Sequence, residues 1–103
     1  TLSSNSFEML PRTFHLNQNY PNPFNPTTEI GYSIPEDIFV SVTIYNVQGR
    51  SIQSLVNQNQ NAGIYVTNWN GKDEKGISMP AGMYFYTIQT DNFKNTKKMI
   101  LLK

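Results

Sequence analysis

The chain lacks several features that would point to enzyme chemistry or to a charged partner. It contains no cysteine, which excludes a disulfide framework, a thiolate nucleophile and a cysteine-based metal site. Its formal net charge is only +1, so no global field would draw nucleic acid or an anionic membrane. No apolar run approaches the roughly 18 residues that span a bilayer. The sequence carries no signal peptide and begins at Thr1, so we expect a piece of a longer protein whose export signal lies upstream.

Residues that carry catalysis are also scarce. His15 is the only histidine and has no second ligand type at metal-binding spacing, so we expect a solvated side chain. Serine and threonine are plentiful, but no Gly-x-Ser-x-Gly context or histidine partner supports a nucleophile. The sequence therefore predicts a non-catalytic protein with no catalytic residue, no cofactor and no dedicated metal site.

One loop leaves a cation as an open alternative. Asn70, Asp73 and Glu74 lie in a glycine-bounded segment, residues 70–76, where their oxygens and the backbone carbonyls could surround Ca²⁺. Their spacing does not follow the pattern of oxygen ligands in an EF-hand. We expect a solvated turn here, with weak Ca²⁺ binding as the alternative.

Alternation of apolar and polar residues is the clearest structural pattern. Val40, Val42 and Ile44 fall on one face of a strand rich in β-branched residues, and no useful length shows a helical period. The expected strands span residues 14–20, 29–34, 40–45, 51–56, 64–69, 83–89 and 96–102, with a polar loop over 57–63. This pattern predicts an all-β fold, an Ig-like antiparallel β-sandwich of about seven strands over residues 14–103, after a linker or tail over 1–13. A small open barrel is the alternative architecture.

The large aromatic residues allow two interpretations. Trp69, Tyr84, Phe85 and Tyr86 could form a platform for sugar rings, or they could fill the sandwich core. Alternation places Phe85 on the face opposite Tyr84 and Tyr86, which argues against one flat platform. We expect core or half-buried positions for them. The expected core comprises Val40, Val42, Ile44, Ile52, Ile64 or Tyr65, Trp69, Tyr84 and Ile88.

The last ten residues contain four lysines and neither Asp nor Glu, so this segment is basic. The lysines are Lys94, Lys97, Lys98 and Lys103. Lysine on an edge strand discourages the addition of another strand, which is one interpretation. The other is a docking patch for an acidic partner. Both interpretations stay open at the level of the sequence.

A proline-rich segment, Tyr20–Pro26, precedes the main series of strands. Each proline fixes its own φ near −65° and pushes the preceding residue toward extended geometry. Asn22 and Asn25 can bond the local backbone as Asx-turns. We expect a stiff corner, anchored by the one large apolar side chain of Phe24.

Five motifs carry a family resemblance that covers residues 16–103. They are the corner Pro21-Asn22-Pro23, the hairpin 44–50, the loop Trp69-Asn70-Gly71, the strand start Gly82-Met83-Tyr84 and the terminus Lys97–Lys103, in this order. The chain resembles the type A C-terminal sorting domains carried by cargo of the type IX (Por) secretion system of Bacteroidota. One departure is Asn70, where many relatives carry Asp. A flagellar hook-capping Ig-like domain shares part of the pattern, although such domains are embedded in longer proteins and need not stop after the last strand.

The resemblance implies an address label without catalytic activity. It implies that outer-membrane secretion machinery recognises the domain after the upstream cargo protein reaches the periplasm of a Gram-negative bacterium. A surface peptidase or transferase then acts on it, so the implied location is secreted or cell surface. The residues implied in recognition are Pro21, Pro23, Gly82, Tyr84, Lys97, Lys98 and Lys103. We expect a monomer with no nucleic-acid partner and no small-molecule substrate.

Two other functions stay open. The domain could be a carbohydrate-binding accessory module of a secreted hydrolase, or an inert Ig-like spacer. Position discriminates among the three, because a terminal signal must end the polypeptide, whereas a module or a spacer can sit anywhere.

Overall fold

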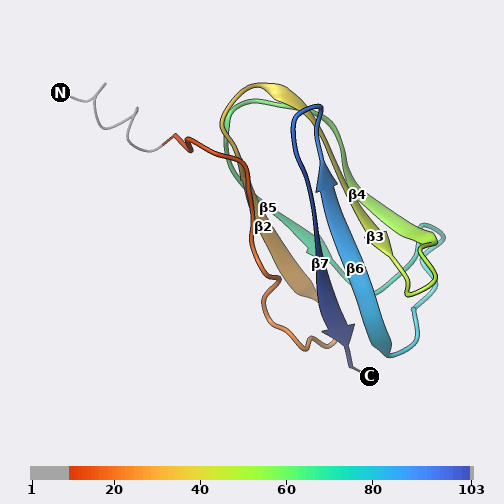
Figure 1. Cartoon of the computed structure of the whole chain (residues 1–103). Coiled ribbons are helices and arrows are strands. Elements are labelled where there is room, and N and C mark those ends of the chain that lie inside the picture. Colours follow the sequence, from red (N-terminus) through yellow and green to blue (C-terminus); the bar gives the residue numbers. More distant parts are fainter. Residues whose placement is uncertain (1–9, 103) are drawn as a thin grey trace.

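A computed structural model of the chain describes residues 10–102, and residues 1–9 and 103 lie outside the described part. Residues 10–102 contain β-strands and no helix (Figure 1). In the same range no helix is therefore long and apolar enough to cross a membrane. The strands are β1 (His15–Leu16), β2 (Thr28–Ile34), β3 (Ile38–Tyr45), β4 (Ser51–Gln60), β5 (Gly63–Trp69), β6 (Gly82–Gln89) and β7 (Lys94–Leu101).

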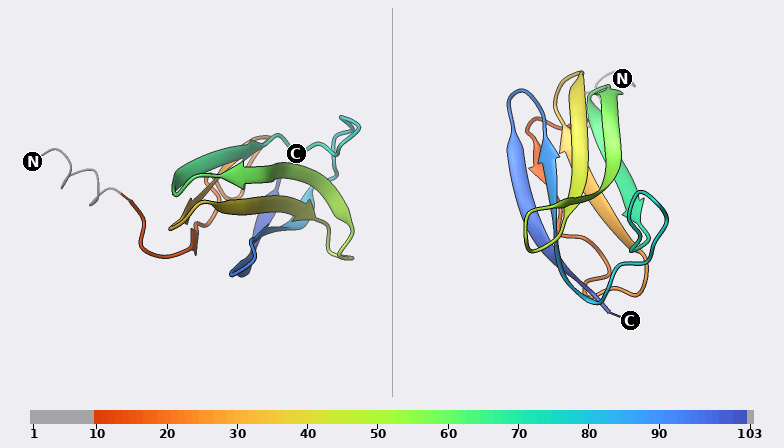
Figure 2. Two further views of the ribbon diagram at one scale, coloured as in Figure 1. Left: turned by 90° about the horizontal axis from the view of Figure 1, so that it is seen from above. Right: turned by 90° about the vertical axis from the view of Figure 1, so that its right-hand side faces the viewer.

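Two antiparallel sheets pack face to face (Figures 1 and 2). Sheet A has the order β1-β2-β5, and sheet B has the order β4-β3-β6-β7. One sheet alone would leave its apolar face in water, so each sheet buries that face against the other. The predicted all-β sandwich of about seven strands is confirmed. Its four edge strands are β1 and β5 in sheet A, and β4 and β7 in sheet B.

The core lies between the two sheets and is filled from both inner faces. Val40, Val42 and Ile44, predicted to share one face of a strand, are all fully buried in β3. Burying each such side chain stabilises the fold by roughly 1.5–3 kcal/mol. Of the pair Ile64 and Tyr65, the structure selects Tyr65, which packs against the core while Ile64 stays exposed. Of the other predicted core residues, Ile52 is partly buried. The remaining three are buried: Trp69, Tyr84 and Ile88.

The aromatic residues follow the predicted alternation. Tyr84 and Tyr86 point into the core, whereas Phe85 is half-buried on the outer face of sheet B. The indole ring of Trp69 meets the ring of Tyr84 edge-on, with 5.2 Å between the ring centroids. Three of the four candidate platform residues therefore belong to the core, and no sugar platform can be built from them.

β4 is longer than the sequence predicted. The expected loop over 57–63 is wrong, because β4 continues to Gln60 and only Asn61 and Ala62 connect it to β5. Residues 57–60 pair in register with residues 38–41 of β3. Backbone hydrogen bonds of a ladder do not require particular side chains, so pairing with the fixed strand β3 overrides the low strand propensity of asparagine.

The first strand is shorter than predicted. Of residues 14–20, only His15 and Leu16 are in β1, and pairing with β2 resumes at a single bridge between Tyr20 and Glu29. Beyond Tyr20 the chain crosses to sheet B, where Phe24 forms a parallel bridge with Leu101 of β7. The segment after β1 therefore makes single bridges to both sheets. The prolines lie in the crossing segment. The last strand begins at Lys94 rather than at Thr96.

Candidate functional site at the proline corner and the last strand

The structure brings the proline corner and the last strand together at one end of the sandwich (Figure 1). Phe24, directly after Pro23, bridges to Leu101. Gly82 pairs with the same Leu101, and Tyr84 pairs with Met99. Three motifs that are far apart in sequence therefore meet around the end of β7. Lys103, also expected in recognition, lies outside the described residues.

Four hydrogen bonds tie the corner and the residues before it to the outer edge of β7. Phe24 N–H donates to the carbonyl of Ile100 at 3.0 Å, and Leu102 N–H donates to the carbonyl of Phe24 at 2.8 Å. Ile100 N–H donates to Asn22 Oδ1 at 3.0 Å. Gln18 Nε2 donates to the carbonyl of Lys98 at 2.8 Å. These bonds satisfy backbone groups that an edge strand otherwise leaves unpaired.

Asn22 therefore has a different role from the predicted one. We expected a local Asx-turn, but its side-chain oxygen accepts a hydrogen bond from a residue 78 positions away. Phe24 does anchor the corner as predicted: it is 1% exposed, and its ring centroid lies 5.7 Å from that of Trp69. Sequence reasoning missed Asn22 and Gln18 as partners of β7, because no local signal distinguishes an amide that bonds its own turn from one that bonds a distant strand.

A buried polar network lies beneath the corner. Asn19 N–H donates to the hydroxyl oxygen of Tyr86 at 2.8 Å, and that hydroxyl donates to the carbonyl of Asn17 at 2.7 Å. The hydroxyl of Thr28 donates to the carbonyl of Pro21 at 2.8 Å and accepts from Asn19 Nδ2 at 3.0 Å. Every buried side-chain nitrogen and oxygen within residues 10–102 has a hydrogen-bond partner. The network holds the corner in a single position against both sheets.

The hydroxyl of Tyr86 is the titratable group of this network. Burial raises the pKa of Tyr86 to about 12, and the hydrogen bond from the Asn19 backbone lowers it in part. The group therefore stays a neutral donor at physiological pH. Its role is structural, since both of its hydrogen-bonding functions are engaged within the protein.

The described lysines of β7 divide between its two faces. Lys98 is exposed on the outer face of sheet B, where it pairs in register with Phe85. Lys97 is half-buried and shares the inward side with Met99, which is fully buried. The strand thus buries apolar side chains on its inner face and presents Lys98 on its outer face.

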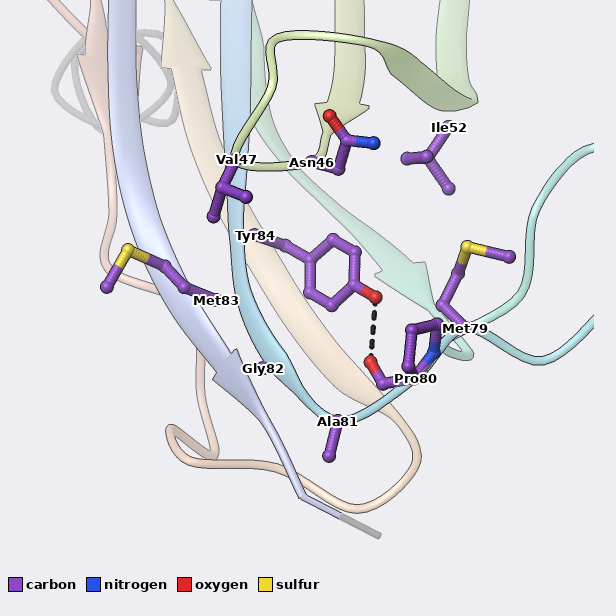
Figure 3. A pocket seen from close by; sticks show the side chains of 9 residues that line it. All are labelled: Asn46, Val47, Ile52, Met79, Pro80, Ala81, Gly82, Met83 and Tyr84. Atoms are coloured by element: carbon purple, nitrogen blue, oxygen red, sulfur yellow. Dashed lines mark hydrogen bonds between the residues drawn. The ribbon is translucent and has the colours of Figure 1, made fainter.

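A shallow cavity of about 290 Å³ lies beside the start of β6 (Figure 3). Its apolar lining includes Val47, Met79 and Met83. The hydroxyl of Tyr84 donates to the carbonyl of Pro80 at 2.7 Å, shown as a dashed line in Figure 3. Burial raises the pKa of Tyr84. Tyr84 is buried apart from a small exposed area, and its ring forms part of the wall of this cavity.

Two of the three side chains proposed for the alternative cation site accept hydrogen bonds from the backbone of their own loop. Asp73 Oδ1 accepts from the backbone N–H groups of Lys75 and Ile77, both at 2.9 Å. Asn70 Oδ1 accepts from Lys72 N–H at 3.2 Å. Within residues 10–102, no group of three or more His, Cys, Asp and Glu side chains could hold a metal ion. The oxygen atoms stabilise turns, as in a solvated loop.

Gly71 lets this loop pack directly under the corner. Its φ is +76°, and a Cβ at this position would lie 3.2 Å from the carbonyl oxygen of Pro26. A side chain here would be strained by the left-handed backbone and crowded by the corner. The Trp69-Asn70-Gly71 motif thus supports the same end of the molecule, since the indole N–H of Trp69 also donates to the carbonyl of Lys72 at 2.8 Å.

Two packed antiparallel sheets, with a bridge from the proline corner to the last strand, define the chain as an immunoglobulin-like β-sandwich module. The sequence profile of the FlgD Ig-like domain family matches residues 22–93, and the chain belongs to that family. The matching family is one of small Ig-like domains rather than of enzymes. No curated protein sequence matches the chain.

Several solved structures share the fold. Dimeric latent PorU from Porphyromonas gingivalis matches with a TM-score of 0.65 and 21% identity, over 82% of this chain and 9% of PorU. PorZ, a surface component of the type IX secretion system of the same species, matches with a TM-score of 0.57 and 17% identity, over 87% of this chain and 11% of PorZ. FlgD from P. aeruginosa matches with a TM-score of 0.57 and 28% identity, over 73% of this chain and 59% of FlgD. The chain thus spans only part of each of these proteins.

Proposed function

We propose that this domain is a non-catalytic C-terminal sorting signal that directs a larger secreted protein through the type IX secretion system. The observation that carries the proposal is the bonding of the proline corner to the last strand. Both segments are motifs of the sorting family that the sequence resembles, and together they form one surface. The Ig-like fold shared with PorU and PorZ is compatible with this function.

The proposed partner is the outer-membrane secretion machinery, with a surface peptidase or transferase acting afterwards. The cargo protein would precede the domain and travel through the periplasm of a Gram-negative bacterium to the cell surface or medium. Lys94, Lys97 and Lys98 make β7 basic, and residues 92–103 contain no carboxylate. Complementary charge across an interface speeds encounter and fixes register, so the partner surface should be acidic.

The proposal is tested with a reporter protein fused ahead of the domain in a host that carries the type IX system. We expect combined Lys97→Gln, Lys98→Gln and Lys103→Gln substitutions to leave the domain folded, because glutamine keeps most of the packing of the lysine stem. Export should fall clearly, and the reporter should accumulate in the periplasm. Cell fractionation and circular dichroism of the purified domain measure the two results.

A matched control removes three positive charges elsewhere. Arg50, Lys72 and Lys75 are exposed in the hairpin and the loop, away from β7, and their change to glutamine should leave export intact. If the β7 variant reaches the cell surface with the same efficiency as the unchanged domain, the lysines serve as edge protection only. Recognition would then lie at the corner Pro21–Pro26 or at the start of β6. If the unchanged domain fails to direct export, the sorting function itself is wrong.

An Ig-like accessory module is the second candidate, and membership in the FlgD Ig-like domain family favours it. A carbohydrate-binding version would need aromatic faces in solvent. Of the four aromatic residues considered for a platform, Trp69, Tyr84 and Tyr86 are buried and Phe85 is half-buried, whereas the exposed aromatic residues Tyr20 and Phe39 lie elsewhere, in the corner and in β3. Pull-down of the domain by insoluble polysaccharides discriminates between the candidates. Micromolar binding that Phe85→Ala removes, with folding intact, would move the carbohydrate function to first place.

A further inference from the structure

Two neighbouring edge strands of the sandwich carry no charged side chain. The segment 51–69 contains no Asp, Glu, Lys, Arg or His, so every charged residue of the chain lies elsewhere. This segment consists of β4, β5 and the two residues that join them. The absence of charge is therefore concentrated on two consecutive strands rather than spread over the molecule.

The two uncharged strands are edges of different sheets. β4 is the outermost strand of sheet B and β5 is the outermost strand of sheet A. They contact each other, and the right-hand view of Figure 2 shows them on the same side of the sandwich. The opposite side is formed by β1 and β7, which the proline corner connects. The molecule thus has one basic side that the corner caps. On the other side the two edge strands carry no charged side chain of their own, and Glu74 N–H of the following loop donates to the carbonyl of Ile52 near the start of β4.

Within residues 10–102, β5 is the edge strand that lacks the features which protect the other three edges from pairing with another chain. β1 contains two residues, β7 carries lysines and is capped by the corner, and the β3–β4 ladder has two register shifts. These are the devices by which proteins prevent edge strands from pairing with another chain. β5 has seven residues that pair without a shift to β2, and it contains neither lysine nor proline. Its outward side chains Ile64 and Val66 are 72% and 62% exposed.

We infer that β5 pairs antiparallel with β5 of a second copy of this chain. A two-fold axis through Tyr65 places Ile64 of each copy opposite Val66 of the other, on the outer face of sheet A. The contact is isologous, as in most soluble homodimers. It joins two three-stranded sheets into one six-stranded sheet and covers the most hydrophobic exposed edge of the domain.

The neutrality of β4 favours a second copy over a single added strand. The same two-fold axis that joins the β5 edges turns the β4 edge of each copy toward the β4 edge of the other. Any charge on β4 would then face its own symmetry mate, and like charges in such a position repel. A lone peptide strand added to β5 would require no neutrality on β4. The uncharged stretch covers both strands, which is compatible with the dimer.

Sedimentation equilibrium of the purified 103-residue chain over increasing concentration tests the dimer. We expect the mass to rise from 11.8 kDa toward twice that value. Ile64→Lys should weaken the association by about tenfold or more, since it places a charge in the apolar part of the contact. Ile77→Lys is the matched control, because Ile77 is also exposed but lies in the loop outside β5. A mass of one chain at every concentration would show the monomer expected from the sequence and overturn the inference.

A mixture of two variants tests the register. Ile64→Lys in one copy should pair with Val66→Glu in the other, so the mixture should associate about tenfold more strongly than either variant alone. Ile64→Lys mixed with Asn68→Glu should show no such gain, because these positions are not opposite each other in the inferred register. Circular dichroism confirms folding of each variant. Association that Ile64→Lys does not weaken, or a gain with Asn68→Glu instead of Val66→Glu, would contradict the inference.

Discussion

Tyr86 connects sheet B to the segment that leads into the proline corner. Its hydroxyl accepts from Asn19 N–H and donates to the carbonyl of Asn17. We expect Tyr86→Phe to keep the packing of the ring but to destabilise the domain by about 1–3 kcal/mol, because Asn19 N–H loses its partner in a buried position. Urea denaturation measures this loss. A change smaller than about 0.5 kcal/mol would contradict a buried network that positions the corner.

The same hydroxyl makes stability depend on alkaline pH. Burial raises the pKa of Tyr86 to about 12, whereas an unfolded tyrosine titrates near 10. Because the folded pKa lies above the unfolded one, the stabilisation is complete below about pH 10 and is lost as the pH rises toward about 12. Burial also raises the pKa values of Tyr32 and Tyr84, so they act in the same direction. Tyr86→Phe should therefore reduce the alkaline loss of stability without abolishing it.

At the scale of the element, β7 depends on the corner for its outer edge. Asn22→Ala removes the acceptor of Ile100 N–H, and we expect a loss of about 0.5–1.5 kcal/mol. The more direct result is local: the Ile100 amide should exchange with solvent at least about tenfold faster, since it loses its hydrogen bond. Hydrogen exchange followed by NMR measures this for each residue.

Asn25→Ala is the control for that element. Asn25 lies in the same corner and is exposed, and among the described residues no hydrogen bond joins it to β7. Its substitution should leave the exchange of the Ile100 amide unchanged. Equal protection of Ile100 in the Asn22→Ala variant and in the parent would mean that the backbone bonds of Phe24 alone hold the edge.

At the scale of the whole molecule, the two sheets share one core and should unfold together. Ile44 lies in sheet B and is fully buried, whereas Trp69, the single tryptophan, lies in sheet A. We expect Ile44→Ala to cost about 2–5 kcal/mol. The denaturation midpoint reported by Trp69 fluorescence should shift as much as the midpoint reported by far-ultraviolet circular dichroism. Separate transitions would show that the sheets are stabilised independently.

The sequence by itself determined the fold class. Apolar residues at every second position predict a strand, as in Val40, Val42 and Ile44. This period is a local property of the sequence, so it can be recognised before the fold is known. The opposite orientation of Phe85 relative to Tyr84 and Tyr86 followed from the same rule. Phe24 was identifiable as an anchor because it is the one large apolar side chain among prolines.

Only the tertiary structure decided which edge strands are left unpaired and which strand the proline corner binds. The bond between Asn22 and Ile100 joins residues 78 positions apart, so no local pattern encodes it. The extension of β4 through Gln60 depends on the neighbouring strand β3 rather than on the side chains of β4. The neutral segment 51–69 is visible in the sequence, but its meaning comes from the placement of β4 and β5 on one side of the sandwich. Hydrogen bonds and packing between distant segments form only when the two sheets come together. These features therefore depend on the tertiary structure and cannot be recognised from local sequence patterns.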